Sequence, residues 1–216
     1  MGSRADERRV DPVVAHEVAA AYTDGPSRRD ALTVAAYSDL VTESDRLSRW
    51  ITSPGRPNRV RVVFTPCQAP YRDAGELICS VTNDRLLEVM TVASDADRRH
   101  PLMGSEPGGA YDRFRAVHDI LGHARLRLGF DRNDEFTVWL TQELFHGPLA
   151  RRALATELHG QHSVPWTTGQ FAGPKAVLLD TELLRRSRHP GRRATNASRC
   201  DRDPGHARQV RRRSQP

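Results

Sequence analysis

The amino-acid sequence predicts an α+β fold, a predominantly helical single domain with a small strand section near residues 59–92. Apolar residues recur at helical spacing in the first fifty positions and again from Ala110 onward, whereas they alternate with polar residues in between. The chain has 216 residues, which suits one ordinary domain with a real core. We expect this globular domain to span residues 1–184 and an arginine-rich tail to occupy residues 185–216.

Two helices are expected before the strand section. Asp11 and Pro12 are typical of a helix start, with the aspartate as cap and the proline in the first turn. Gly25 and the proline after it end this helix. A second helix is predicted over about residues 28–50, where apolar residues form an inward stripe.

The strand section begins where the period changes to two. The alternating apolar residues are Val60, Val62 and Phe64. They alternate with Arg59, Arg61 and Val63, which is the pattern of a strand. A short helix around residues 74–81 and an apolar stretch over residues 86–92 complete the section.

A long connection follows, from Ser94 to Gly109, and it is rich in proline and glycine. Connections of this length inside a compact domain often line or cover a site. After it, residues 110–162 are expected to hold three helices that carry the functional groups.

Glycines punctuate these three helices. The first covers about residues 111–121 and is expected to stop at Gly122, in a left-handed C-terminal cap. The second covers about residues 133–146 and is ended by Gly147. The third opens at Pro148 and is expected to close at Gly160.

The positive charge of the chain lies in its tail. The net charge is +6, and residues 185–216 hold eleven arginines against two aspartates, a local charge of 11 − 2 = +9. Residues 1–184 therefore carry 6 − 9 = −3. We expect the tail to be disordered, and a nucleic-acid partner would bind through the tail rather than through the acidic body.

Other bulk features indicate a cytoplasmic protein without a membrane segment. No apolar run approaches the roughly 20 residues needed to cross a bilayer. The three cysteines, Cys67, Cys79 and Cys200, are widely spaced and odd in number, which favours a reducing compartment. The oligomeric state does not follow from the sequence.

Histidines and carboxylates cluster between His118 and His162. The candidate donors are His118, His123, Glu143, His146, Glu157, His159 and His162. A divalent metal needs three or four donors that converge from different segments, and imidazole with carboxylate is the usual choice for zinc and iron. Consecutive helices can supply such donors by projecting side chains toward one another.

The spacing of His118 and His123 is unusual. Five positions rotate by about 140° on a straight α-helix, so the two rings would not share a face. They can converge if the helix ends at Gly122 and His123 lies just beyond it. This is not the His-Glu-x-x-His pattern of zinc proteases, which keeps its ligands four residues apart.

The segment His118-Asp-Ile-Leu-Gly-His123 is similar to the His-Glu-Leu-Leu-Gly-His signature of the pterin-dependent aromatic amino acid hydroxylases. The resemblance covers about residues 111–160 only. Within it, the Gln142-Glu143 pair and the segment Ala155-Thr-Glu-Leu-His-Gly160 also resemble stretches of that family.

The resemblance implies an iron(II) site whose ligands are His118, His123 and Glu157. Glu143 remains a rival for the third ligand, because the gap to Glu157 is shorter than in the family. Iron held by two histidines and one carboxylate keeps open positions for oxygen and substrate.

The leading expectation is a mononuclear non-haem iron oxygenase of hydroxylase type that acts on an unknown small molecule. A zinc-dependent hydrolase is the second enzyme hypothesis, with zinc in place of iron and Asp119 or Glu143 as the catalytic base. A non-catalytic accessory or DNA-associated protein that uses its basic tail is the alternative from another class.

Overall fold

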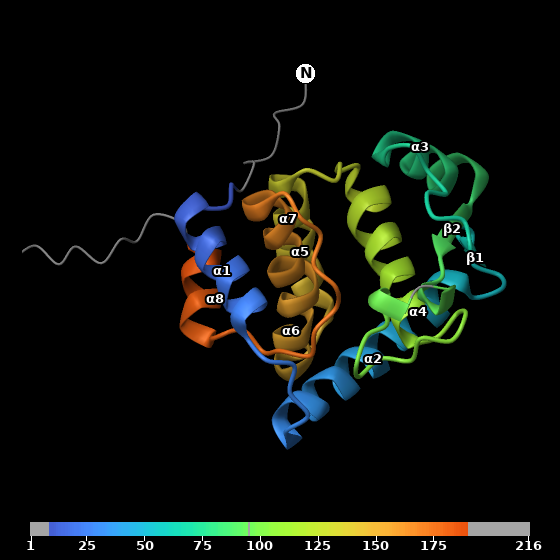
Figure 1. Cartoon of the computed structure of the whole chain (residues 1–216). Helices are drawn as coiled ribbons and strands as arrows, with labels where there is room; N and C mark the ends of the chain where they lie inside the picture. Colours follow the sequence, from blue (N-terminus) through green and yellow to red (C-terminus); the bar gives the residue numbers. More distant parts are fainter. Residues whose placement is uncertain (1–8, 95, 190–216) are drawn as a thin grey trace, which may run out of the picture.

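The computed structural model of the chain describes residues 9–94 and 96–189 (Figure 1). Its α-helices there are α1 (Pro12–Asp24), α2 (Ala31–Thr52), α3 (Ala74–Cys79), α4 (Ala110–His118), α5 (Arg132–Gln142), α6 (Pro148–Ala155), α7 (Gln161–Thr168) and α8 (Thr181–Arg188). Its strands are β1 (Arg61–Thr65) and β2 (Leu86–Met90). The α+β class with a predominantly helical body is thus confirmed.

Several helices continue into turns of different pitch. The π-helical turns are η1 (Ser80–Asp84), η4 (Asp119–Ala124) and η6 (Thr156–Gly160). The 3₁₀ turns are η2 (Val92–Ser94), η3 (Ala96–Arg98) and η5 (Glu143–Phe145). The π-helix is rare and often marks a functional site.

Aspartate caps set the helix starts. The Asp11 carboxylate accepts hydrogen bonds from the backbone of Val13 at 2.8 Å and Val14 at 3.4 Å, and Pro12 occupies the first turn, as predicted. Asp131 caps α5 in the same way, because its side chain accepts hydrogen bonds from the backbone amides of Asn133 and Asp134. Such caps satisfy backbone donors that have no partner inside the helix.

The two strands form a parallel pair, with Arg61 opposite Leu86 and Thr65 opposite Met90. Parallel neighbours need a crossover connection, and α3 with η1 supplies it. The sheet packs on α4 and η1, so the predicted strand section is a small α/β unit beside the helical body.

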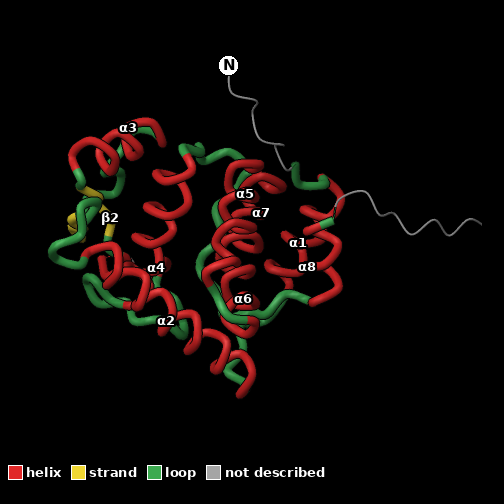
Figure 2. The backbone as a smooth tube through the Cα atoms, turned by 180° about the vertical axis from the view of Figure 1, so that it is seen from behind, coloured by secondary structure: helices red, strands yellow, loops and turns green. Residues whose placement is uncertain are grey.

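Figure 1 shows α4 between this unit and the remaining helices, while α2 runs along both parts. In Figure 2, seen from behind, the strands lie at one end and α1, α5, α6, α7 and α8 gather at the other. The buried residues accordingly form two clusters. One joins α1, α2, α4 and α5–α8. The other joins β2, α3, η1, η4, the end of α4 and the end of α2, and Val62 and Phe64 of β1 pack against it.

The end of the body differs from the prediction. Helix α8 continues through residue 184 to Arg188, so four residues assigned to the tail are helical. The predicted disorder of the remaining tail, from residue 190 onward, lies outside the described residues. Among the described helices, none is long and apolar enough to span a membrane.

Two glycines predicted to stop helices lie inside them instead. Gly122 belongs to η4 and Gly160 ends η6, and neither has a positive φ, so the predicted left-handed cap at Gly122 is wrong. A Cβ on Gly122 would lie 2.4 Å from Val138 Cγ1, and one on Gly160 would lie 2.9 Å from Tyr22 Cδ2. These glycines therefore permit close contact between elements rather than a chain reversal.

Candidate metal centre

The turn η4 brings His118 and His123 together. In a π-helical turn the hydrogen bonds run from residue i to i+5, so residues five apart lie over one another. The two Nε2 atoms are 3.0 Å apart, and the ring planes meet at 89°. The predicted convergence of the pair thus occurs, through a widened turn rather than through a helix end at Gly122.

Glu135 of α5 completes the group. Its Oε2 lies 3.5 Å from His118 Nε2 and its Oε1 lies 3.5 Å from His123 Nε2. One donor atom from each of the three residues lies within 4.8 Å of the others. Metal–donor bonds of about 2.0–2.2 Å place neighbouring donors about 3–3.5 Å apart, so the spacing fits one ion.

The contact between η4 and α5 depends on Gly122. Val138 lies one turn after Glu135 on α5, and its side chain occupies the space where a Cβ of residue 122 would be. Glycine therefore allows α5 to approach η4 closely enough for the Glu135 carboxylate to reach both imidazoles.

Gln142 sets the orientation of the His118 ring. Its Nε2 donates to the carbonyls of Val117 and His118, both at 3.4 Å, which leaves its Oε1 facing His118 Nδ1 at 3.3 Å. His118 Nδ1 therefore carries a proton, and Nε2 is the ring nitrogen that faces Glu135. A hydrogen bond to the far ring nitrogen is the usual support of a metal-binding histidine.

His162 of α7 holds the other side of the carboxylate. Its Nδ1 lies 2.8 Å from Glu135 Oε2, and its ring centroid is 5.8 Å from that of His118. About a quarter of its side chain is exposed (27%), more than any of the three grouped residues. His162 is thus the titratable group between the triad and solvent.

Opposing effects set the protonation of this cluster. Burial raises the pKa of the Glu135 carboxyl, but the charge of His162 and hydrogen bonds from three imidazoles hold that pKa well below its ordinary value. Burial lowers the pKa of His123, but the hydrogen bond to Glu135 and its charge outweigh this and raise the pKa. The carboxylate is therefore ionised and ready to bind a cation.

Within the described part of the chain, the Nδ1 atom of His123 has no hydrogen-bond partner comparable to the Gln142 amide that contacts Nδ1 of His118. Nδ1 is buried and has no hydrogen-bond partner among the described residues. Binding a metal through Nε2 would place a proton on this unpaired nitrogen, at a cost of about 1–3 kcal/mol. His123 is therefore the weaker of the two imidazole donors.

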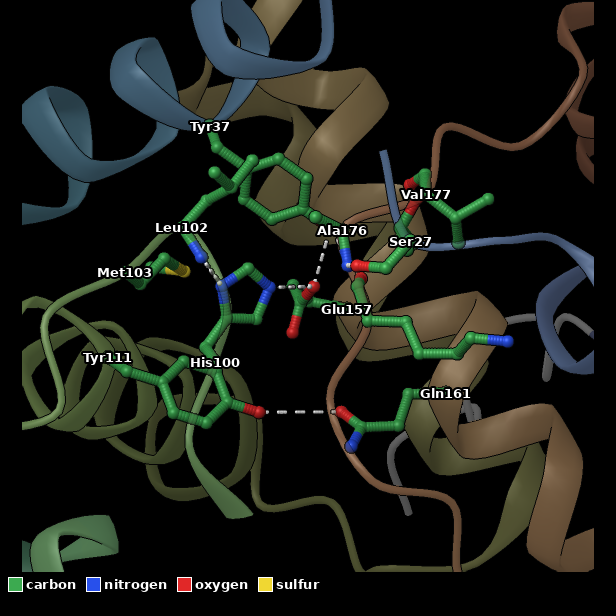
Figure 3. Close-up of polar contacts among 12 residues, drawn as sticks. Ser27, Tyr37, His100, Leu102, Met103, Tyr111, Glu157, Gln161, Ala176 and Val177 are labelled. Carbon is green, nitrogen blue, oxygen red and sulfur yellow. Dashed lines mark hydrogen bonds and ion pairs between the residues drawn. The ribbon is translucent and has the colours of Figure 1, made fainter. Parts of the chain in front are cut away.

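Glu157, the carboxylate that the resemblance implies as third ligand, lies in another buried cluster (Figure 3). Its Oε1 accepts hydrogen bonds from Tyr37 at 2.7 Å and from His100 Nε2 at 3.1 Å. His100 Nδ1 accepts from the Leu102 amide at 3.0 Å, so Nε2 holds the proton that it donates to Glu157. The structure thus places Glu135, not Glu157, beside the histidine pair.

The other expected site residues also lie apart from the triad. Glu143 accepts hydrogen bonds from the Arg188 guanidinium, with Nε 3.0 Å from Oε2. Arg188 belongs to α8, a helix that the sequence analysis did not predict. Asp119 is half-buried in η4 and makes no hydrogen bond through its side chain to a described residue; its charge contributes to the raised pKa of His123. Neither carboxylate joins the donor group.

The two remaining histidines of the predicted cluster have structural partners. His146 Nδ1 lies 2.9 Å from Glu43 Oε2, which also accepts from the backbone of Gly147. His159 stacks on Trp139 with ring centroids 4.4 Å apart, and its Nε2 is 3.0 Å from Ser187 Oγ. Burial lowers the pKa of His159 to about 3, so this ring is neutral.

Sequence reasoning missed Glu135 and His100. Glu135, Val138 and Gln142 follow helical spacing, so the face of the expected helix that carries the conspicuous Gln142 also carries a carboxylate. His100 lies in the long connection predicted to line or cover a site, but nothing in the pattern singled it out.

Comparison with models of protein families, with curated proteins and with solved structures finds no match for this chain.

Proposed function

We propose that this chain is a mononuclear non-haem iron(II) enzyme of the oxygen-dependent hydroxylase type, acting on a small molecule. The observation that carries the proposal is the convergence of His118 Nε2, His123 Nε2 and the Glu135 carboxylate within 4.8 Å. Two imidazoles and one carboxylate form the facial triad that oxygen-activating iron uses. Iron bound here would supply the oxygen chemistry.

The protein groups around the triad have distinct tasks in this proposal. The ionised Glu135 would offset the cation charge, and Gln142 keeps Nε2 of His118 directed at the site. His162 hydrogen-bonds Glu135 and lines a narrow cavity of about 10 Å³ with Trp166, so it is placed to hold a proton at Nδ1. A cavity of that size admits about one water molecule.

The resemblance to the pterin-dependent hydroxylases favours iron over zinc. It rests on His118-Asp-Ile-Leu-Gly-His123, whose two histidines are both donors in the proposed site. The third ligand in the proposal is Glu135 in place of Glu157, because Glu157 is engaged by Tyr37 and His100.

Metal titration of the purified protein tests the site. Iron(II) under anaerobic conditions is expected to bind at one equivalent, and His118→Ala, His123→Ala and Glu135→Ala should each lose it. His16→Ala is the matched control, because His16 is an exposed histidine on α1. Glu143→Gln and Glu157→Gln should retain the metal. Unaltered metal content in Glu135→Ala would refute the proposed ligand set.

The identity of the metal separates the alternatives. Oxygen uptake by the iron-loaded protein, abolished by His118→Ala, is expected for an oxygenase. Zinc that is held tightly while iron(II) is not would favour a metal-dependent hydrolase. Binding of neither ion, together with salt-sensitive DNA binding that removal of residues 190–216 abolishes, would instead favour the accessory function.

A further inference from the structure

A groove of about 580 Å³ lies beside η4, away from the metal donors. Ile120, Leu121 and Ala124 of η4 line it, whereas His118 and His123 of the same segment meet Glu135 of α5. Its volume falls in the range of small-molecule sites, about 300–1,000 Å³. The groove is thus a second candidate site, separate from the triad.

The floor of the groove is apolar and one wall is aromatic. Val60, Val81 and Leu121 form part of the floor and are each buried. Trp50 is 48% exposed on the wall, and the Arg56 guanidinium lies 3.7 Å from its ring centroid. An exposed tryptophan above an apolar floor suits a ligand with a planar body.

The rim of the groove carries positive charge. Arg85, Arg125 and Arg127 line the groove and are exposed, and no aspartate or glutamate of the described chain lines it. Side-chain ion pairs of the described residues involve none of these three arginines. Three guanidinium groups around one groove match a ligand with more than one negative charge.

The backbone at two of these arginines is strained. Arg85 has φ +56° and Arg127 has φ +57°, and within residues 9–94 and 96–189 they are the only residues other than glycine with a positive φ. Arg85 follows η1, and Arg127 follows the helical turn after η4, positions where glycine or asparagine is usual. The left-handed conformation costs an L-residue about 1–2 kcal/mol. Both strained arginines line the same groove.

We propose that this groove binds a nucleoside phosphate. The phosphate lies among Arg85, Arg125 and Arg127, because guanidinium groups bind phosphate oxygens in pairs. The base lies over the apolar floor beside Trp50. Asn58 lines the same groove and offers an amide that can donate to and accept from the edge of a base.

Titration calorimetry with AMP, ADP, adenosine and inorganic phosphate tests this proposal on the full chain. The test variant is Arg85→Asn with Arg127→Asn, because asparagine tolerates the left-handed backbone and so preserves the fold. Arg28→Asn is the matched control, an exposed arginine outside the groove. ADP affinity is expected to fall at least tenfold in the double variant, with an unchanged melting temperature, and to stay unchanged in the control.

The outcomes separate the groove from other anion sites. ADP that binds the double variant as tightly as the wild type would overturn the proposal, since the binding would then reside elsewhere, such as in the arginine-rich tail. Inorganic phosphate that binds as tightly as ADP would also overturn it, because the base would contribute nothing. No binding of any nucleotide would overturn it as well. Metal-free His118→Ala should bind ADP normally, so the result is independent of the proposed iron site.

Discussion

Replacing Gly122 by alanine tests whether the proposed metal site depends on the close approach of η4 to α5. The added Cβ would lie 2.4 Å from Val138 Cγ1, whereas ordinary contact begins near 3.4 Å. The two elements must therefore separate by about 1 Å, or the Val138 side chain must move. Overpacking of this kind costs about 1–3 kcal/mol, and the better helix propensity of alanine offsets about 1 kcal/mol of it.

The effect on metal binding should be larger than the effect on stability. Metal–donor distances tolerate about 0.2 Å, so a shift of α5 by about 1 Å takes Glu135 out of range. We expect the Gly122→Ala variant to bind iron(II) at least tenfold more weakly in an anaerobic titration, with a far-ultraviolet circular dichroism spectrum like that of the wild type.

A second substitution should reverse this loss. Val138→Ala removes the Cγ atoms, and the closest remaining neighbour of the new Cβ would be Val138 Cβ at 3.5 Å, an ordinary contact. The double variant should therefore regain metal affinity. Gly160→Ala is the control, because its Cβ would meet Tyr22 at 2.9 Å, away from the donors, and should reduce stability without weakening metal binding. Wild-type affinity in Gly122→Ala, or no recovery in the double variant, would refute the reasoning.

Three further predictions concern single side chains. Gln142→Leu removes the acceptor of the His118 Nδ1 proton and should weaken metal binding by about 10–100-fold in the same titration, whereas equal affinity would contradict its positioning role. Tyr37→Phe removes a hydrogen bond to buried Glu157 and should cost about 1–3 kcal/mol in urea unfolding while metal affinity stays constant; a lost metal would instead implicate Glu157 as a ligand. The pKa of His159 is lowered to about 3 in the folded chain, below its ordinary value of 6.5, so its unfolded form takes up the proton first. Its contribution to stability is therefore fully present above pH 6.5 and is lost as the pH falls toward 3, by at most about 1.4 kcal/mol per pH unit. When the free energy of unfolding is measured between pH 7 and pH 5, the His159→Phe variant should lose less stability on acidification than the wild type, and an equal loss would contradict this role of His159.

Much of the fold follows from local pattern. Asp11 and Pro12 start α1 where predicted, and the change from helical spacing to alternation near Val60 marks the small sheet. These features depend on neighbours in the chain, because capping and periodicity are local effects. Helix α8 was not predicted, since its buried face is short and its remaining residues are mostly charged.

The glycines show where local reasoning ends. A glycine after an apolar run often ends a helix, and the sequence offers no sign that Gly122 and Gly160 instead lie against Val138 and Tyr22. Their partners are distant in the chain or on another helix, so only the packed structure reveals why glycine is present.

The sequence by itself predicted the histidine pair at residues 118 and 123, because histidines and carboxylates cluster within residues 118–162. The third donor was decided by tertiary structure alone. Glu143 and Glu157 were the third-ligand candidates in the sequence, and Glu135 was not among them. Packing brings the Glu135 side chain to two imidazoles, Glu143 to the Arg188 guanidinium, and Glu157 to Tyr37 and His100. A carboxylate becomes a candidate ligand through the approach of α5 to η4, which is a property of packing and not of spacing.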